Sequence, residues 1–188
     1  MYQTKPKLIN IGGNSLLGSI LPAGAVKALS QVKETVQKGA ELFNQGRQII
    51  DEVRNTVAVV RQLADDPMAA LAYLPGILTN LDGALGNFGE LTGMNDLFEG
   101  VHKVLPAISD FARESAGIYG DLQSMKESLT LGKESNGSNW DSWFKPADNA
   151  LSNINERIDN AAASVAAMTA WIVLREDEDV THDTADRT

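Results

Sequence analysis

Few residues of this 188-residue chain have side chains that commonly carry out chemistry. The two histidines, His102 and His182, are far apart, and neither has a carboxylate at the spacing of a metal site such as HExxH. The acidic run Glu176–Asp179, together with Asp183, offers carboxylates to Ca²⁺ but lacks the alternating ligands and central glycine of a calcium loop. We therefore interpret the histidines as surface residues and the run as a solvated tail, and predict no metal site.

Motifs for covalent or cofactor chemistry are missing as well. The chain has no cysteine, which excludes disulfides, thiolate metal sites and cysteine catalysis. Gly12-Gly13 and the later glycines form neither GxGxxG nor a P-loop, and no strand pattern precedes them. No GxSxG motif and no nucleophile–base pair is present. We predict a non-enzymatic protein without a cofactor.

One short aromatic motif, WDSWF, stands at the start of an apolar helical pattern and contains Trp140, Trp143 and Phe144. Two interpretations are open. The three rings form an interfacial anchor or a hot spot for a partner, or they form a hydrophobic plug that closes the open end of a helical bundle. We favour the plug.

Charge is distributed unevenly along the chain. Residues 1–64 carry eight Lys/Arg against four Asp/Glu, a net charge of +4, whereas residues 65–188 carry eight against twenty-one, a net charge of −13. Such a split can align copies head to tail or order two segments of one chain, although each face being solvated explains it as well. No stretch is basic enough for a nucleic-acid footprint, and no specific nucleic-acid binding is expected.

Residues 8–26 form an uncharged N-terminal stretch rich in small residues (LINIGGNSLLGSILPAGAV). A helix of this length would be about 28 Å long, near the thickness of a hydrocarbon core, but glycines, serines and Pro22 interrupt it. A signal peptide with Ala23-Gly24-Ala25 as cleavage site is a second interpretation. The third, which we favour, is a segment that packs against partners or inserts conditionally into a membrane.

The elements that must position these residues are helices. From residue 25 to 64, apolar residues recur every seven positions, with a second set three residues later, and this 3–4 spacing is typical of a coiled-coil stripe, here called a seam. Gly39 and Gly46 fall on the seam, where they indicate close backbone approach. Asp65-Asp66-Pro67 ends the helix, and Asp66 is expected to cap a short new helix with Pro67 at its first position.

The middle of the chain predicts a glycine-rich helix after Leu74-Pro75-Gly76. Leu78, Leu81, Leu85, Phe88 and Leu91 line one face, and four glycines, at positions 76, 83, 86 and 93, line the other. A second seam then runs through Met94, Leu97, Val101, Val104, Ile108, Phe111, Ser115, Ile118, Leu122, Met125 and Leu129. Pro106 is expected to kink this helix or divide it in two, and Gly132 is expected to cap its C-terminus.

A polar loop, GKESNGSN at residues 132–139, is the best place for the chain to turn back. The third seam consists of Leu151, Ile154, Ile158, Ala161, Val165, Met168 and Ile172. Residues 161–174 are uncharged throughout, which is too short a stretch for a typical membrane span. The acidic tail from residue 175 onward is expected to fray.

Together these patterns predict an all-α fold, an elongated helical hairpin or bundle with three long coiled-coil-like helices and a short glycine-rich helix. The expected organisation is an apolar N-terminal segment at 1–24, a helical domain at 25–174 and an acidic tail at 175–188. The residues predicted to form helix-seam interfaces are Leu29, Val36, Gly39, Phe43, Gly46, Ile50, Val57, Ile108, Phe111, Ile118, Leu122, Leu151, Ile154 and Ile158.

The favoured function is that of a structural protein that self-associates through its seams in a larger particle, such as a virion-internal or DNA-delivery component. That likeness is one of layout only. It implies partners that are proteins, an N-terminal segment (residues 8–26) that engages a membrane or a neighbouring shell protein, and a location in a virion or cell envelope. The alternatives are an exported helical component of a secretion or conjugation apparatus, similar in outline to minor pilins, and a membrane-surface protein with amphipathic helices.

Overall fold

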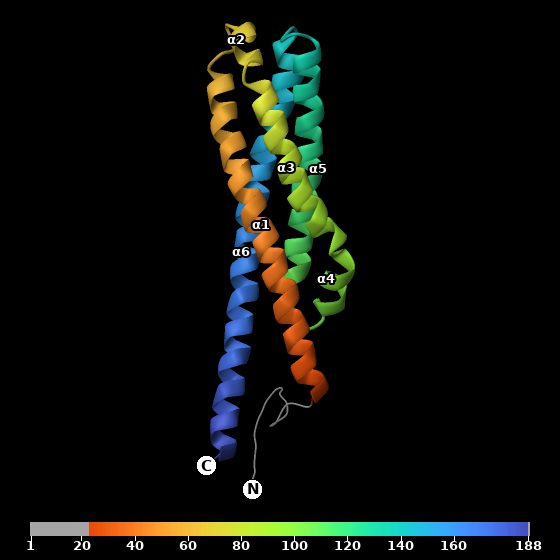
Figure 1. Ribbon diagram of the computed structural model, residues 1–188, viewed down its shortest axis with the longest axis vertical. Coiled ribbons are helices and arrows are strands. Elements are labelled where there is room, and N and C mark those ends of the chain that lie inside the picture. The colour runs from red at the N-terminus through yellow and green to blue at the C-terminus, as the bar shows by residue number, and fades with distance from the viewer. Residues whose placement is uncertain (1–22, 188) are drawn as a thin grey trace. The chain divides into compact units, whose positions relative to one another are not determined.

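The computed structural model describes residues 23–187 of the chain, and the side chains of residues 29–177 (Figure 1). In this range every regular element is a helix, which confirms the all-α prediction. The helices are α1 (Ala23–Arg61), α2 (Pro67–Leu71), α3 (Leu74–Gly93), α4 (Asn95–Val101), α5 (Ala107–Glu134) and α6 (Trp140–Arg187).

The chain divides into two compact units. Unit 2 is continuous in sequence, from Lys38 to Val165, whereas unit 1 combines residues up to Gln37 with those from Ala166 onward. Helices α1 and α6 each contribute residues to both units. Each unit is described separately below.

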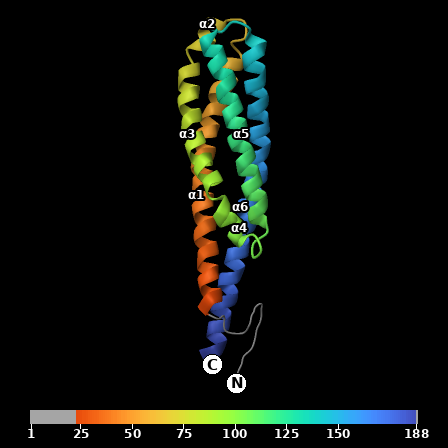
Figure 2. The ribbon, with the colours of Figure 1, turned by 90° about the vertical axis from the view of Figure 1, so that its right-hand side faces the viewer.

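Unit 2 is a four-helix bundle in which sequential neighbours are antiparallel (Figures 1 and 2). Phe43 of α1 contacts Phe88 of α3, and Gly46, further along α1, contacts Asn87, which comes earlier in α3. The two helices therefore run in opposite directions. Helices α3 and α5 are antiparallel as well, because Asp82 pairs with Lys126 and Gly89 with Tyr119. For α5 and α6 the pairs are Asp121–Arg157 and Gly132–Trp143. For α6 and α1 they are Arg54–Asn155 and Arg61–Asp148. The four helices therefore form a closed ring around one core.

The connection from α1 to α3 follows the predicted capping pattern. Helix α1 ends at Arg61, three residues before the expected end, and a turn leads to Asp66. The Asp66 side chain accepts a hydrogen bond from the Ala69 backbone N–H at 3.2 Å, and Pro67 occupies the first turn of α2. This confirms the predicted N-cap and the predicted proline position.

The glycine-rich stretch is a regular helix, α3, that begins at Leu74 and therefore includes Pro75 and Gly76 in its first turn. Its buried face consists of Leu74, Ile77, Leu81, Ala84, Phe88 and Leu91. Leu78 and Leu85, expected on that face, are half-buried, and the glycines at 76, 83, 86 and 93 are exposed. Packing of the apolar face against α1 and α5 compensates for the low helix propensity of these glycines.

In the first half of the second seam, Met94 and Val101 are buried as predicted, whereas Leu97 and Val104 are not. The chain leaves helical geometry after Val101 and resumes at Ala107, so Pro106 lies at the boundary that divides α4 from α5. Leu97 is 56% exposed and Val104 50% exposed, while Phe98 and Leu105 are buried in their place. Spacings of three-then-four and four-then-three both fit a helical stripe, and the larger ring of Phe98 fills the core next to Phe111 at 5.8 Å between centroids.

Gly132 does not cap α5, because the helix continues to Glu134. The C-cap is Ser135, and the residue after it, Asn136, adopts the left-handed conformation. Asn136 has a φ of 51°, its N–H bonds the Lys133 carbonyl at 3.2 Å, and the Gly137 N–H bonds the Gly132 carbonyl at 2.8 Å. These are the two hydrogen bonds of a Schellman motif, and they begin the turn into α6.

Helix α6 continues to Arg187, so the acidic tail that was expected to fray is helical. In unit 1 the last residues of α6 accompany the first residues of α1. Lys33 Nζ lies 2.7 Å from Glu176 Oε2. Among the residues of this unit whose side chains are described, Val32, Thr35, Val36, Met168 and Ile172 are buried, and Leu29 is half-buried. Residues 1–22, which hold most of the apolar N-terminal segment, lie outside the described residues.

Candidate interaction surfaces

The predicted seam residues of unit 2 are turned toward the chain's own core. Ten apolar members of the predicted set are at most 2% exposed: Phe43, Ile50, Val57, Ile108, Phe111, Ile118, Leu122, Leu151, Ile154 and Ile158. The rings of Phe43, Phe88, Phe98 and Phe111 meet edge to face at centroid distances of 5.8–6.2 Å. These contacts join α1, α3, α4 and α5 within one chain, so this part of the seams is occupied by intramolecular partners.

The two seam glycines are packed against aromatic rings. A Cβ on Gly46 would come within 2.5 Å of Cε2 of Phe88, and a Cβ on Gly39 would come within 3.2 Å of Cε2 of Phe111. The first distance is shorter than real Cβ contacts, and the ring is confined in the core. The predicted close approach at these positions is therefore between a helix backbone and a ring.

The WDSWF residues lie at the first turn of α6, next to the end of α5. Trp143 is buried, its indole covers Gly132 so closely that no side chain fits there, and its Nε1–H points at the Gly137 carbonyl at 3.4 Å. Phe144 is buried and stacks on the half-buried Trp140 at 4.5 Å between centroids. These positions favour the interpretation as a plug of unit 2 over that as an exposed anchor.

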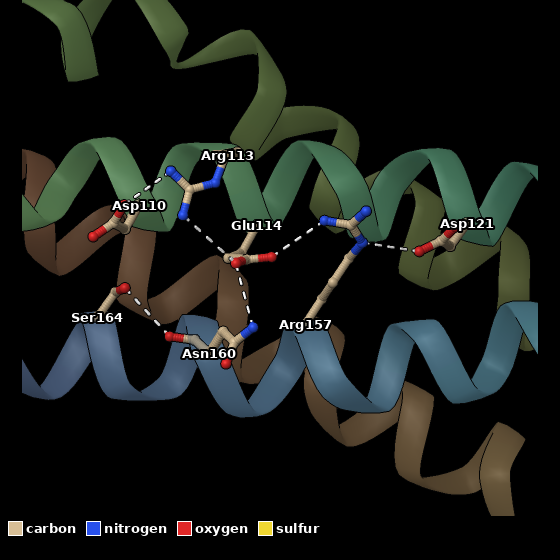
Figure 3. A network of polar contacts seen from close by, with 7 residues as sticks. All are labelled: Asp110, Arg113, Glu114, Asp121, Arg157, Asn160 and Ser164. Atoms are coloured by element: carbon tan, nitrogen blue, oxygen red, sulfur yellow. Dashed lines mark hydrogen bonds and ion pairs between the residues drawn. The ribbon is translucent and has the colours of Figure 1, made fainter.

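A polar network joins α5 to α6 in the middle of unit 2 (Figure 3). Arg157 donates from Nη1 to Glu114 Oε1 at 3.2 Å and from Nε to Asp121 Oδ2 at 3.1 Å. The other Glu114 oxygen accepts from Asn160 Nδ2 at 3.4 Å and faces Arg113 Nη2 at 3.8 Å. The Glu114 side chain is only 11% exposed, so the cost of burying its charge is offset by these partners.

Gly117 makes room for this network, because any side chain there would overlap the Arg157 guanidinium. The guanidinium therefore lies across the backbone of α5 and reaches carboxylates one turn to either side. The arrangement favours one register of α6 on α5, because a one-residue slip would take Arg157 and Asn160 away from the buried Glu114 carboxylate.

Helices α1 and α6 are tied by a different kind of contact. In unit 2 Arg61 makes a two-pronged pair with Asp148, at 2.6 and 3.3 Å, and the hydrogen bond to Asp148 raises the pKa of the Arg61 guanidinium. Arg54 donates to Asn155 Oδ1 at 3.0 and 2.7 Å. Both arginine side chains are about half exposed, so such pairs add little to stability and mainly set alignment.

The outer face of α6 changes in character along the helix. In unit 2 it is polar, and Ser152, Asn153, Glu156, Asp159 and Asn160 are exposed there. In unit 1 the same side of the helix is apolar, with exposed Ala166, Ala167, Ala170, Val173 and Leu174. Val173 is 48% exposed and Leu174 59% exposed, and these are large apolar side chains for a solvated helix face.

The part of the chain with described side chains does not bring residues with potential chemistry together. His102 is exposed, with Nδ1 2.8 Å from the Glu99 carbonyl, and His182 lies where side chains are not described. Among the described residues, no group of three or more His, Asp or Glu side chains is placed to hold a metal ion. Within residues 23–187, no helix is both long and apolar enough to cross a membrane.

Several residues that matter for packing were not singled out from the sequence: Phe98, Leu105, Glu114, Arg157 and Gly117. A signal existed for Glu114, which lies three residues after Phe111 and four before Ile118 and so occupies a position on the buried face. The exposed apolar face of α6 was visible only as an uncharged stretch. Comparison with protein-family models, curated proteins and solved structures finds no match to this chain.

Proposed function

We propose that this chain is a non-enzymatic structural protein that associates with other copies of itself in a larger particle, of the virion-internal or DNA-delivery type. The observation that supports it best is that α6 carries no charged residue between Ala161 and Leu174, where Ser164 and Thr169 are the two polar residues and apolar residues lie on all sides of the helix. A helix that is apolar all round is one that is covered on all sides. In unit 1 the side that carries Met168 and Ile172 is buried, and the opposite side is exposed.

The four-helix core of unit 2 is consistent with a structural role for that unit. Its seam residues are used within the chain, and its outer α6 face is polar. Association by coiled-coil-like pairing is therefore proposed for helix surfaces that the chain itself leaves open. The N-terminal segment, residues 8–26, is proposed to engage a membrane or a neighbouring protein of the particle.

The test is the association state of the full chain, measured by light scattering across a wide range of protein concentrations, together with co-sedimentation with phosphatidylcholine vesicles. The proposal expects dimers or larger species that dissociate on dilution. A chain that stays monomeric at high concentration and does not bind vesicles contradicts it. Mass spectrometry of the natively expressed protein separates the exported alternative, which requires the Met1–Tyr2 end to be removed.

A further inference from the structure

Helix α6 presents two apolar faces in unit 1, and among the described residues only one of them is buried. At 100° per residue, Met168 and Ile172 point to one side, and both are buried. Ala166, Ala167, Ala170, Val173 and Leu174 are spaced by three and four and are centred on the opposite side, where all five are exposed. We call these five residues the outer apolar face.

We infer that the outer apolar face is where two copies of this chain pair, with their α6 helices antiparallel about a twofold axis at Ala170. This inference rests on the proposed function and specifies the surface by which the copies associate. A twofold contact uses the same patch on both partners, so the patch must be complementary to itself.

The order of small and large residues meets that requirement. In an antiparallel pair centred on Ala170, a residue three positions after the axis faces one three positions before it. Val173 of one copy therefore faces Ala167 of the other, Leu174 faces Ala166, and Ala170 faces its own equivalent. Each bulky side chain meets a small one, which gives knob-and-hole packing and lets the backbones approach closely at the centre.

Charge favours the antiparallel arrangement over the parallel one. The acidic run Glu176–Asp179 follows the outer apolar face directly. In a parallel pair the two runs would lie side by side and repel each other. In the antiparallel pair they lie at opposite ends, about 22 Å apart along the helices at 1.5 Å per residue, which exceeds two Debye lengths in physiological salt.

Charge also favours a second copy over a lipid surface as the occupant. Helices that lie on membranes carry Lys and Arg beside their apolar face, because cellular membranes are anionic. Here four consecutive carboxylates follow the apolar face, and the single cation of its last turn, Arg175, lies 4.9 Å from the ring of Trp171. An anionic bilayer would repel this end of the helix.

Disulfide trapping in the full chain tests the geometry, because the protein has no cysteine of its own. Ala170→Cys should give a covalent dimer on mild oxidation, since the two residues 170 meet at the axis. Thr169→Cys, equally exposed but 100° around the helix, is the matched control and should stay monomeric. Leu174→Cys should also fail to link to its equivalent, because the two positions lie about 12 Å apart along the axis and a disulfide needs its Cα atoms within about 7 Å.

A second variant, Ala170→Glu, places an unpaired charge at the centre of the contact. It should weaken association in light scattering by about tenfold or more, with helicity by circular dichroism unchanged because the position is exposed. Efficient cross-linking of Leu174→Cys overturns the antiparallel arrangement.

If the chain self-associates but Ala170→Cys does not cross-link and Ala170→Glu has no effect, the inference fails and the proposed function stands. If the chain stays monomeric and ignores vesicles, both fail. Vesicle binding that Ala170→Glu abolishes would assign the outer face to lipid and overturn the inference.

Discussion

Helix α6 takes part in both units, and its two parts differ in how their apolar residues are used. In unit 2 the apolar residues of α6, such as Leu151 and Ile158, lie on one side, and the outer side is polar. In unit 1 the outer side carries Ala170, Val173 and Leu174. A helix of a completed bundle needs only one apolar stripe, so the second, exposed stripe distinguishes the part of α6 in unit 1 from the part in unit 2.

The largest difference between the units should appear in core substitutions. Phe111→Ala removes a ring that touches Phe43 and Phe98, and should lower the free energy of unfolding by about 3–5 kcal/mol. Leu174→Ala, on the outer face in unit 1, should change it by less than about 0.5 kcal/mol when measured in dilute solution. Urea unfolding followed by circular dichroism measures both. Similar losses from the two substitutions would mean that Leu174 is covered within the single chain.

The next largest effect concerns the buried carboxylate of unit 2. Glu114→Gln keeps the shape of the side chain but removes the charge that faces Arg157, and should lower the free energy of unfolding by about 2 kcal/mol. The loss is smaller than for a fully buried ion pair, because the Arg157 side chain is 39% exposed. Glu127→Gln, exposed on the same helix, is the control and should cost almost nothing. A double-mutant cycle with Arg157→Met should show coupling between the two positions, and additive effects would contradict a joint role.

A pair of glycine substitutions should have opposite signs. Gly46→Ala brings a Cβ within 2.5 Å of Phe88 and should destabilise unit 2 by about 1–2 kcal/mol, even though alanine favours the helix. Gly86→Ala, where an added Cβ would meet nothing within 4 Å beyond its chain neighbours and its own helix backbone, should stabilise by up to about 1 kcal/mol. Thermal unfolding of the two variants reads out the signs. Two stabilising substitutions would show that α1 and α3 are not closely packed.

The smallest effect is expected in unit 1. Lys33→Ala removes an ion pair with Glu176 whose two side chains are each more than two-fifths exposed, and the change should be below about 0.5 kcal/mol. What remains should disappear in high salt, because exposed charges are screened. Unfolding in low and high salt checks this, and a large salt-independent loss would indicate a buried role for Lys33.

The fold could be predicted from the sequence where a residue pattern is compatible with only one local structure. Asp66 followed by Pro67 specifies an N-cap and a first turn, and both are found. The prediction was wrong for Leu97 and Val104, because a stripe through these two residues and a stripe through Phe98 and Leu105 both fit the helical period. The period alone does not indicate which of the two stripes is buried. Gly132 was interpreted as a cap from its position alone, whereas its real constraint is Trp143 on the next helix.

The candidate surfaces were less predictable than the core. An uncharged stretch in α6 is readable from the sequence, but which side of it is covered depends on the positions of the other helices. The role of Arg157 likewise depends on Gly117, forty residues earlier on another helix. Contacts of this kind are properties of the packed pair and have no local signal.

Unit 1 joins residues that are far apart in the sequence, as the pair of Lys33 and Glu176 shows. The two residues are 143 positions apart, so unit 1 closes only after α6 has been synthesised, whereas residues 38–165 emerge from the ribosome beforehand and can fold as a unit. Closing so long a loop costs less once the intervening chain is already compact. The outer apolar face belongs to unit 1, so the α6 residues of unit 2 can already have partners within the chain when this face is synthesised.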